Sequence, residues 1–170
     1  MKFFNLIGTI MLITACNNIE NELKPEIRIK YFPGDTVLKH IISFNSSGLA
    51  DGLCFSFYKN GKLRNIEDNK EGKLNGEILN FFENGRLESK SSYKDGKKDG
   101  IFYGYYPSGN KRYQLIWKDD IRVSYAVEYG DTNTLNPILY WEYDSLGQQT
   151  YKAIYNKEGS IIIQETGKKR

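Results

Sequence analysis

The chain has 170 residues, which is enough for one ordinary domain and too few for two once an export leader is removed. It contains 13 Tyr, 9 Phe and 16 Gly, a composition that favours strands and tight turns over helices. Lys and Arg exceed Asp and Glu by only three (24 against 21), and so small an excess argues against a nucleic-acid binder.

Residues 1–15 have the features of an export signal. Lys2 is followed by an apolar stretch over 3–13, about 11 residues, whereas a membrane-spanning helix needs about 20. The segment ends in Ile13-Thr14-Ala15-Cys16, which resembles the lipobox of bacterial lipoproteins. The resemblance implies cleavage before Cys16 and lipidation of that residue, so we expect a lipid anchor in a membrane of the bacterial cell envelope. An ordinary secretory leader with a free Cys16 is the alternative.

A flexible tether and a single β-domain are predicted after the leader. Residues 16–26 are polar and cannot bury enough apolar surface to fold, which is typical of a tether. The domain is expected over 27–170 and opens with a hairpin over 27–50. Its strands are predicted over 27–31 and 37–44, around the turn Pro33-Gly34-Asp35.

A repeat of 24 residues governs the regular part of the domain, 51–124. Gly52, Gly76 and Gly100 are spaced by 76 − 52 = 24 and 100 − 76 = 24. Gly48, Gly72 and Gly96 keep the same interval, as do Gly61, Gly85 and Gly109. Glycine preceded by Asn or Asp is a strong hairpin-turn signal, because these residues adopt positive φ at little cost. The predicted structural turns are therefore at Gly52, Gly61, Gly72, Gly76, Gly85, Gly96, Gly100 and Gly109.

Each unit is predicted to contain two strands joined by these turns. The first strands are expected over 53–58, 77–82 and 101–106, and the second over 62–70, 86–94 and 111–118. Stacked units give an all-β fold, an antiparallel meander of about 24-residue β-hairpin repeats that forms an elongated, mostly single-layer sheet.

Period-two alternation assigns side chains to the two faces of this sheet. Phe55, Leu79 and Tyr103 share one face across the repeats, and Cys54, Ile78 and Phe102 share the other. We expect the aromatic residues to serve first as core. An exposed aromatic ladder that binds a partner is the alternative, and its candidate binding residues are Tyr58, Phe82, Tyr105, Tyr106 and Trp117.

The repeat resembles the MORN-repeat-variant family. The matching residues are Phe81-Phe82-Glu83-Asn84-Gly85-Arg86-Leu87 with Tyr93-Lys94-Asp95-Gly96-Lys97-Lys98-Asp99-Gly100, and Tyr105-Tyr106-Pro107-Ser108-Gly109 with Trp117-Lys118-Asp119. The resemblance is specific over about 48–120. It implies a curved single-layer sheet of hairpins that serves protein or lipid contacts, and some bacterial members are antitoxin-like neutralisers of secreted toxins. No catalytic residues come with it.

The regular pattern ends after the third unit. Asp120 stands where a further glycine is expected, and 130–137 interrupts the period, which indicates an inserted loop. A degenerate unit is predicted from 143–147 and 155–159, with a closing strand over 161–163. Residues 125–170 are thus expected to hold the loop insertion and the closing repeats, and atypical end units cap a repeat array.

The leading functional hypothesis is an interaction or scaffold module held at the envelope, with a protein partner bound by the sheet face or by the loop at 130–137. No cofactor or metal is expected, because His40 is the only histidine and Cys54 is the only cysteine besides Cys16. A cell-wall glycan-binding or hydrolysing enzyme is the alternative, with Glu83, Glu88, Glu142 or Asp144 as its acids. A third hypothesis is direct binding to a lipid surface through Lys73, Lys97 and Lys98.

Overall fold

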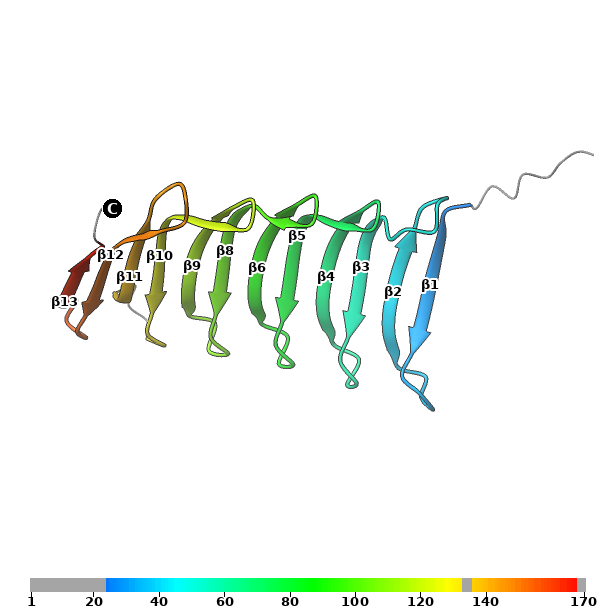
Figure 1. Ribbon diagram of the computed structural model, residues 1–170. Coiled ribbons are helices and arrows are strands. Elements are labelled where there is room, and N and C mark those ends of the chain that lie inside the picture. Colours follow the sequence, from blue (N-terminus) through cyan, green and yellow to red (C-terminus); the bar gives the residue numbers. More distant parts are fainter. Residues whose placement is uncertain (1–23, 133–135, 168–170) are drawn as a thin grey trace, which may run out of the picture.

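The computed structural model describes residues 24–132 and 136–167. Within this part of the chain, thirteen strands form one open antiparallel sheet and no helix occurs, so the predicted all-β meander is confirmed (Figure 1). No described helix is therefore long and apolar enough to cross a membrane. The strands are β1 (Glu26–Tyr31), β2 (Leu38–Phe44), β3 (Gly52–Phe57), β4 (Leu63–Lys70), β5 (Lys73–Phe81), β6 (Leu87–Lys94), β7 (Lys97–Lys98), β8 (Gly100–Tyr105), β9 (Lys111–Lys118), β10 (Ile121–Tyr129), β11 (Pro137–Tyr143), β12 (Gln149–Tyr155) and β13 (Ile161–Thr166).

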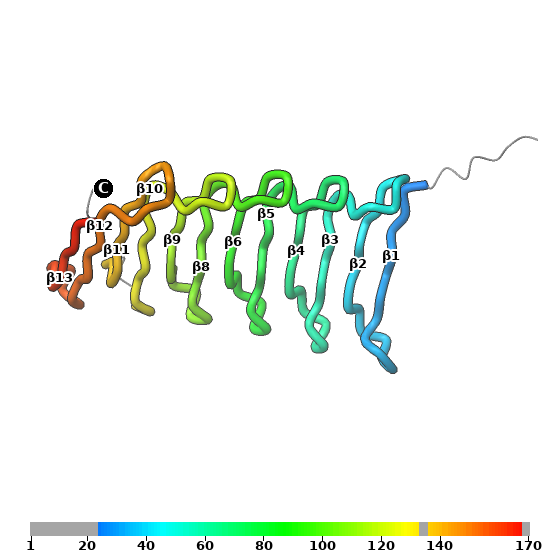
Figure 2. The backbone as a smooth tube through the Cα atoms, viewed as in Figure 1, coloured from blue at the N-terminus to red at the C-terminus, as the bar shows by residue number. Residues whose placement is uncertain are grey.

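The sheet is a single layer built by sequential pairing. Each strand from β1 to β13 pairs with the next one along the chain, except that the two-residue β7 pairs with β6 beside β8. The strands lie side by side in one row, with β1 and β13 at opposite ends (Figures 1 and 2). Two strands of the opening hairpin, six of the regular units and the closing strand occur where the sequence predicts them, apart from an earlier start of β5.

One edge of the sheet carries the Asn-Gly turns. In the turn at 58–62, the Tyr58 amide donates to the Lys62 carbonyl at 2.8 Å and the Gly61 amide donates to the Tyr58 carbonyl at 2.9 Å. The Asn60 side chain accepts the Lys62 amide at 3.0 Å. The backbone pattern recurs on the same edge in the turns at 82–86, 106–110 and 156–160, and at the opposite ends of the strands in the turns at 45–49 and 144–148. The Asn-Gly pair therefore satisfies the turn's polar groups and supplies the left-handed residue it needs.

The opposite edge carries tighter hairpin tips, at 71–72, 95–96 and 119–120. Glu71, Asp95 and Asp119 have φ of 50°, 50° and 49° there. The residues that follow pair at once, so β5 begins at Lys73 and β7 begins at Lys97, earlier than the sequence predicts. Pairing between Lys70 and Lys73 extends the strands right up to the tip.

The backbone keeps its 24-residue period beyond the last glycine. Gly76 and Gly100 have φ of 144° and 118°, and Ser124, which follows Gly100 by one period, has φ of 64°. Asp120, in the place of the expected glycine, has φ of 67°. Asp and, less readily, Ser tolerate this region through local hydrogen bonding of their short polar side chains. The hairpin geometry therefore continues through β10, one unit further than the glycines indicate.

The three hairpin tips 71–72, 95–96 and 119–120 line up at the same ends of the strands, and we call this row the rail (Figure 2). Backbone hydrogen bonds connect each tip to the preceding unit. The Gly72 amide donates to the Ala50 carbonyl at 2.8 Å, and the Gly96 amide donates to the Leu74 carbonyl at 2.8 Å. The Asp120 amide donates to Lys98 at 3.0 Å in the same way. Each tip thus docks on the unit that precedes it.

The core is a thin strip across the sheet. Cys54, Ile78, Phe102 and Ala126 are buried and spaced by 24 residues, each two positions after a left-handed residue. Ring contacts extend the strip, with the Phe102 ring centroid 6.0 Å from that of Trp117. No large side chain in the described ranges is completely buried. The ladder of interstrand hydrogen bonds and this strip hold the sheet together, and both of its faces stay largely uncovered.

Candidate interaction surfaces

A row of apolar side chains runs along one face of the sheet over β2 to β8, which we call the apolar face. Strand register places its side chains directly opposite one another, from Ile41 to Phe55, from Phe55 to Ile66 and from Ile66 to Leu79. Phe57 and Phe81 lie two residues further along the same strands and face Leu63 and Leu87. These side chains are half-buried, and no second layer covers them within the described ranges. An exposed apolar area of this kind is typical of an interaction site.

The apolar face carries little net charge. Its central row continues from Leu79 to Lys90 and then to Tyr103. The Lys90 ammonium lies 2.5 Å from the Glu77 carboxylate, so the one cation of this row has an anionic partner beside it. The surface therefore suits an apolar partner better than an anionic one.

Tyrosines extend this face toward the carboxyl-terminal end of the sheet. The rings of Tyr125 and Tyr140 are stacked at 6.3 Å, and the ring of Tyr151 lies 6.2 Å from that of Tyr140. The Tyr140 hydroxyl donates to the Glu142 carboxylate at 3.1 Å. Burial and this hydrogen bond raise the pKa of Tyr140 to about 12, so its hydroxyl is protonated under ordinary conditions.

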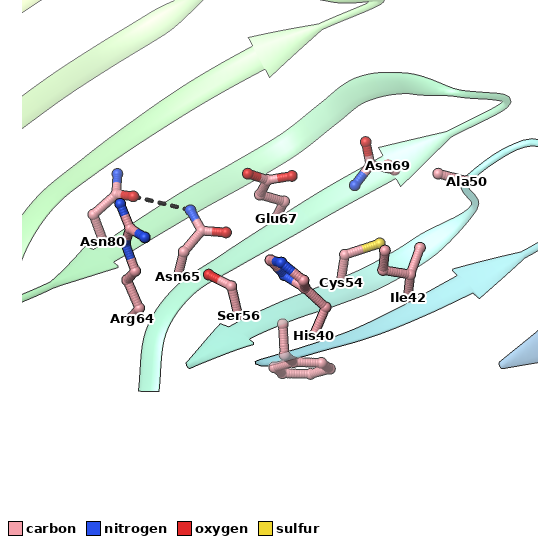
Figure 3. Close-up of a pocket in the computed structure, with 11 residues that line it drawn as sticks. His40, Ile42, Ala50, Cys54, Ser56, Arg64, Asn65, Glu67, Asn69 and Asn80 are labelled. Carbon is pink, nitrogen blue, oxygen red and sulfur yellow. Dashed lines mark hydrogen bonds between the residues drawn. The ribbon is translucent and has the colours of Figure 1, made fainter. Parts of the chain in front are cut away.

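The other face contains a polar hollow of about 490 Å³ over β2 to β5 (Figure 3). Asn65, Glu67 and Asn69 project from alternate positions of β4 on the same side as His40 and Ser56 (Figure 3). The hollow is lined by His40, Ile42, Ala50, Cys54, Phe55, Ser56, Arg64, Asn65, Glu67, Asn69 and Asn80.

An amide ladder orders one side of the polar hollow. The Asn65 side chain donates to that of Asn80 at 2.9 Å, and Asn80 in turn donates to the Ser89 hydroxyl at 2.9 Å. Burial lowers the pKa of His40, and the nearby cations Lys39, Lys30 and Arg64 lower it further. His40 is therefore a neutral donor and acceptor at neutral pH, and the hollow offers mixed hydrogen-bonding groups.

Two predicted binding residues link neighbouring repeats. The Tyr58 hydroxyl donates to the Phe81 carbonyl at 2.7 Å, and the Tyr106 hydroxyl donates to the Tyr129 carbonyl at 2.9 Å. Arg64 and Arg112 lie over these two rings, each 5.7 Å from the ring centroid. Tyr58 and Tyr106 are thus engaged in structural contacts between units.

A smaller hollow of about 300 Å³ gathers three of the predicted binding residues on the turn edge. It is lined by Phe82, Glu88, Ser89, Tyr105, Tyr106, Pro107, Arg112 and Tyr113. The structure therefore brings Phe82, Tyr105 and Tyr106 together, while Tyr58 lies one unit away and Trp117 lies in the core strip.

Trp117 is surrounded by cations near the rail. The Lys98 ammonium is 4.4 Å from its ring centroid, and the Arg122 guanidinium is 5.2 Å from it. The buried indole nitrogen of Trp117 has no hydrogen-bond partner in the described chain. Lys98 is therefore occupied by an aromatic contact, whereas Lys73 and Lys97 are exposed at the tips. The same tips carry Glu71, Asp95 and Asp119, so the rail is not a uniformly basic surface.

The four acids considered for catalysis are spread over separate elements. Glu88 lines the smaller hollow. Glu83 accepts a hydrogen bond from Asn60 at 3.2 Å, and Glu142 accepts one from Tyr140. Asp144 caps its own turn by accepting the amides of Leu146 and Gln148, each at 2.9 Å. In the described part of the chain, no group of three or more His, Cys, Asp or Glu is arranged to hold a metal ion.

The predicted loop at 130–137 connects β10 to β11, and its last residue, Pro137, already belongs to β11. Its beginning is tied to the preceding unit, because Asp131 accepts hydrogen bonds from Ser108 at 2.5 Å and from Asn110 at 2.9 Å. Residues 133–135 lie outside the described ranges.

Comparison with protein families gives one match, which falls on the regular units. The model of the MORN repeat variant matches residues 50–68, 74–95 and 98–119. These three segments are similar to the MORN repeat variant. Each matched segment contains one Asn-Gly or Ser-Gly turn and the strands on either side of it. Searches of the curated proteins and of the solved structures give no significant match.

Some surface residues were not singled out by the sequence. Ile66 and Leu63 belong to the apolar face, but they lie three residues apart in β4, so simple alternation would separate them, and the register shift opposite Ser56 and Phe57 brings them to one face. The polar hollow had no local signal either, because His40, Glu67 and Asn80 come together only through the register of separate strands.

Proposed function

We propose that this protein is a non-enzymatic interaction module of the bacterial cell envelope, which docks a partner protein on the apolar face of its MORN-repeat sheet. The uncovered row of Ile41, Phe55, Ile66 and Leu79 supports this proposal most directly. A single-layer sheet presents such a row on rigid strands, so a partner can bury it with little loss of conformational entropy.

The chemistry of the apolar face favours a protein partner over a lipid surface. Binding to anionic lipid depends on clustered Lys and Arg. The central row holds one cation, Lys90, and that cation is paired with Glu77. A partner with an apolar patch of its own complements this surface.

Site-specific photo-crosslinking tests the docking face. A benzoylphenylalanine in place of Leu79 should form an adduct with the partner in living cells. The same residue in place of Asn80 should form little, because Asn80 is the next residue of β5 and points to the opposite face. The two positions share a strand and a similar degree of burial, so they are matched controls for expression and folding.

The crosslinking pattern can contradict the proposal in two ways. Equal or stronger adducts from position 80 would place the partner on the polar face. No adduct from position 79, in a protein that retains its strand content by circular dichroism, would mean that the apolar face docks nothing.

A secreted toxin is the class of partner that the family resemblance implies. Neutralisation would follow if the toxin's active surface were buried against the apolar face. Co-expression of this protein should then protect cells from a secreted toxin that it binds, and protection should be lost in Leu79→Lys and kept in Leu146→Lys, an exposed turn residue.

Anchoring through Cys16 completes the proposed envelope role. Cys16 lies outside the described residues, and its assignment depends on the lipobox-like sequence. Cys16→Ser should move the protein from the membrane fraction to the soluble fraction, because acyl chains supply the membrane affinity. Cys54→Ser, at the other cysteine, should leave the distribution unchanged. A Cys16→Ser protein that stays in the membrane fraction would rule out lipid anchoring at this residue.

The polar hollow favours a second function, the binding of a hydroxyl-rich ligand such as a cell-wall glycan. Its amides, hydroxyl and carboxylate are the groups that exchange hydrogen bonds with sugars. Retention on peptidoglycan fragments that is lost in Asn69→Ala and kept in Leu79→Lys would identify the hollow as that site. Release of a cleavage product would indicate a hydrolase instead.

A further inference from the structure

The two ends of the open sheet differ in their chemistry. β1 and β13 are edge strands, each paired on one side only, and they lie at opposite ends of the row (Figure 1). The outward amides and carbonyls of an edge strand have no partner strand and can pair with another chain. Whether they do so depends on the side chains that flank them.

β1 carries the features that natural proteins use to block edge pairing. Three of its six residues are charged, Glu26, Arg28 and Lys30, and Pro25 immediately precedes the strand. The Arg28 guanidinium is held by the Glu26 carboxylate and lies 4.2 Å from the Phe44 ring centroid. A strand arriving at this edge would have to displace these charges from water.

β13 lacks such protection. It begins with three consecutive isoleucines, Ile161, Ile162 and Ile163, whose side chains are 49%, 62% and 48% exposed. Its single charged residue is Glu165. The Gly167 amide donates to the Thr150 carbonyl of β12, so the chain up to this residue stays on the inner side of β13 and does not cover the outer edge. Exposed β-branched residues on an unprotected edge are the usual basis of strand addition.

We propose that β13 is a dimerisation edge, at which it pairs antiparallel with the β13 of a second copy about a two-fold axis perpendicular to the sheet. This axis reverses the strand direction and keeps equivalent faces on the same side, so the two sheets become one. With Ile162 on the axis, Ile161 of each copy lies opposite Ile163 of the other, and apolar residues pair throughout the junction. Both copies use the same strand, so the assembly closes at two and leaves the protected β1 edges outward.

The mass of the detergent-solubilised full-length protein tests the dimer. Light scattering after gel filtration should give twice the chain mass for the wild type and one chain mass for Ile162→Lys, which places a cation beside its own copy on the axis. Ile29→Lys is the matched control, since Ile29 is a similarly exposed isoleucine in the other edge strand, and it should stay dimeric. Native strand content by circular dichroism verifies that both variants fold.

Disulfide trapping tests the geometry independently. Facing residues of an antiparallel pair have Cα atoms about 4.5–5.5 Å apart, within the range of a disulfide. Ile162→Cys should therefore form a covalent dimer on mild oxidation, whereas Ile163→Cys, which faces Ile161 of the other copy, should form little, and Ile29→Cys and the wild type should form none. A monomeric wild type, equal dissociation by Ile29→Lys and Ile162→Lys, or open-ended polymers broken by a change at either edge would each overturn the proposal. None of these results bears on the apolar face, so this test and the crosslinking test fail separately.

Discussion

Gly76→Val should be among the most destabilising single substitutions in the regular units. Gly76 has φ of 144°, and an added Cβ would lie 2.4 Å from the Asp68 carboxylate oxygen and 2.8 Å from the Asp68 Cβ. The left-handed conformation costs a non-glycine residue about 1–3 kcal/mol, and the clash adds to this cost. Each kcal/mol should lower the melting temperature by roughly 2–4 °C for a domain of this size. Thermal unfolding followed by circular dichroism measures the shift.

Gly85→Asn is the control that keeps a positive φ but removes the clash. Gly85 also has positive φ, at 90°, but an added Cβ there would meet no atom within 4 Å. Asn tolerates the left-handed region, so this variant should melt within a few degrees of the wild type. A Gly76→Val protein with the wild-type melting temperature would contradict the assigned conformation of Gly76 in β5.

Gly104→Asn should be strongly destabilising for a different reason: the new side chain would clash with the Tyr113 ring on the neighbouring strand. An added Cβ at Gly104 would lie 2.1 Å from Cε1 of Tyr113, its register partner in β9. The preceding unit holds Asn80 opposite Ser89, two smaller side chains joined by a hydrogen bond of 2.9 Å. The glycine therefore compensates for the large tyrosine, and filling both positions should cost about 1–3 kcal/mol or more.

The double variant Gly104→Asn, Tyr113→Ser recreates the pair of the preceding unit. It should be more stable in urea unfolding than Gly104→Asn alone, because removing the ring removes the clash. If the second change lowers the free energy of unfolding further, the two positions are not coupled in the way the register indicates.

The sequence predicted the turns well because their signals are local. Asn60-Gly61 and its equivalents supply a cap and a left-handed residue within a few positions, so the hairpins could be placed without knowledge of the rest of the fold. Strand β10 and the left-handed conformation of Asp120 and Ser124 were not predicted, because a backbone position can keep its conformation after its glycine is lost. The early start of β5 was missed because pairing at the tip is set by the neighbouring strand.

The candidate surfaces were only partly predictable. Alternation in the first strand of each unit identified Phe55 and Leu79 as members of one face. The contacts of Tyr58 and Tyr106 were not predictable, since no local pattern shows that their hydroxyls reach carbonyls 23 residues further along the chain. The polar hollow also depends on contacts between residues far apart in sequence, which composition and spacing do not specify.

In each backbone hydrogen bond of the rail, the donor comes later in the chain than the acceptor. Gly72, Gly96 and Asp120 each donate an amide to a carbonyl 22 residues earlier, at Ala50, Leu74 and Lys98. A polypeptide emerging amino end first thus presents the carbonyl acceptor of each of these three bonds before its donor arrives. These backbone bonds favour the addition of each hairpin to the one before it, whereas the bond of 2.9 Å from the Lys98 amide to the Asp120 carboxylate forms only when the next tip is in place.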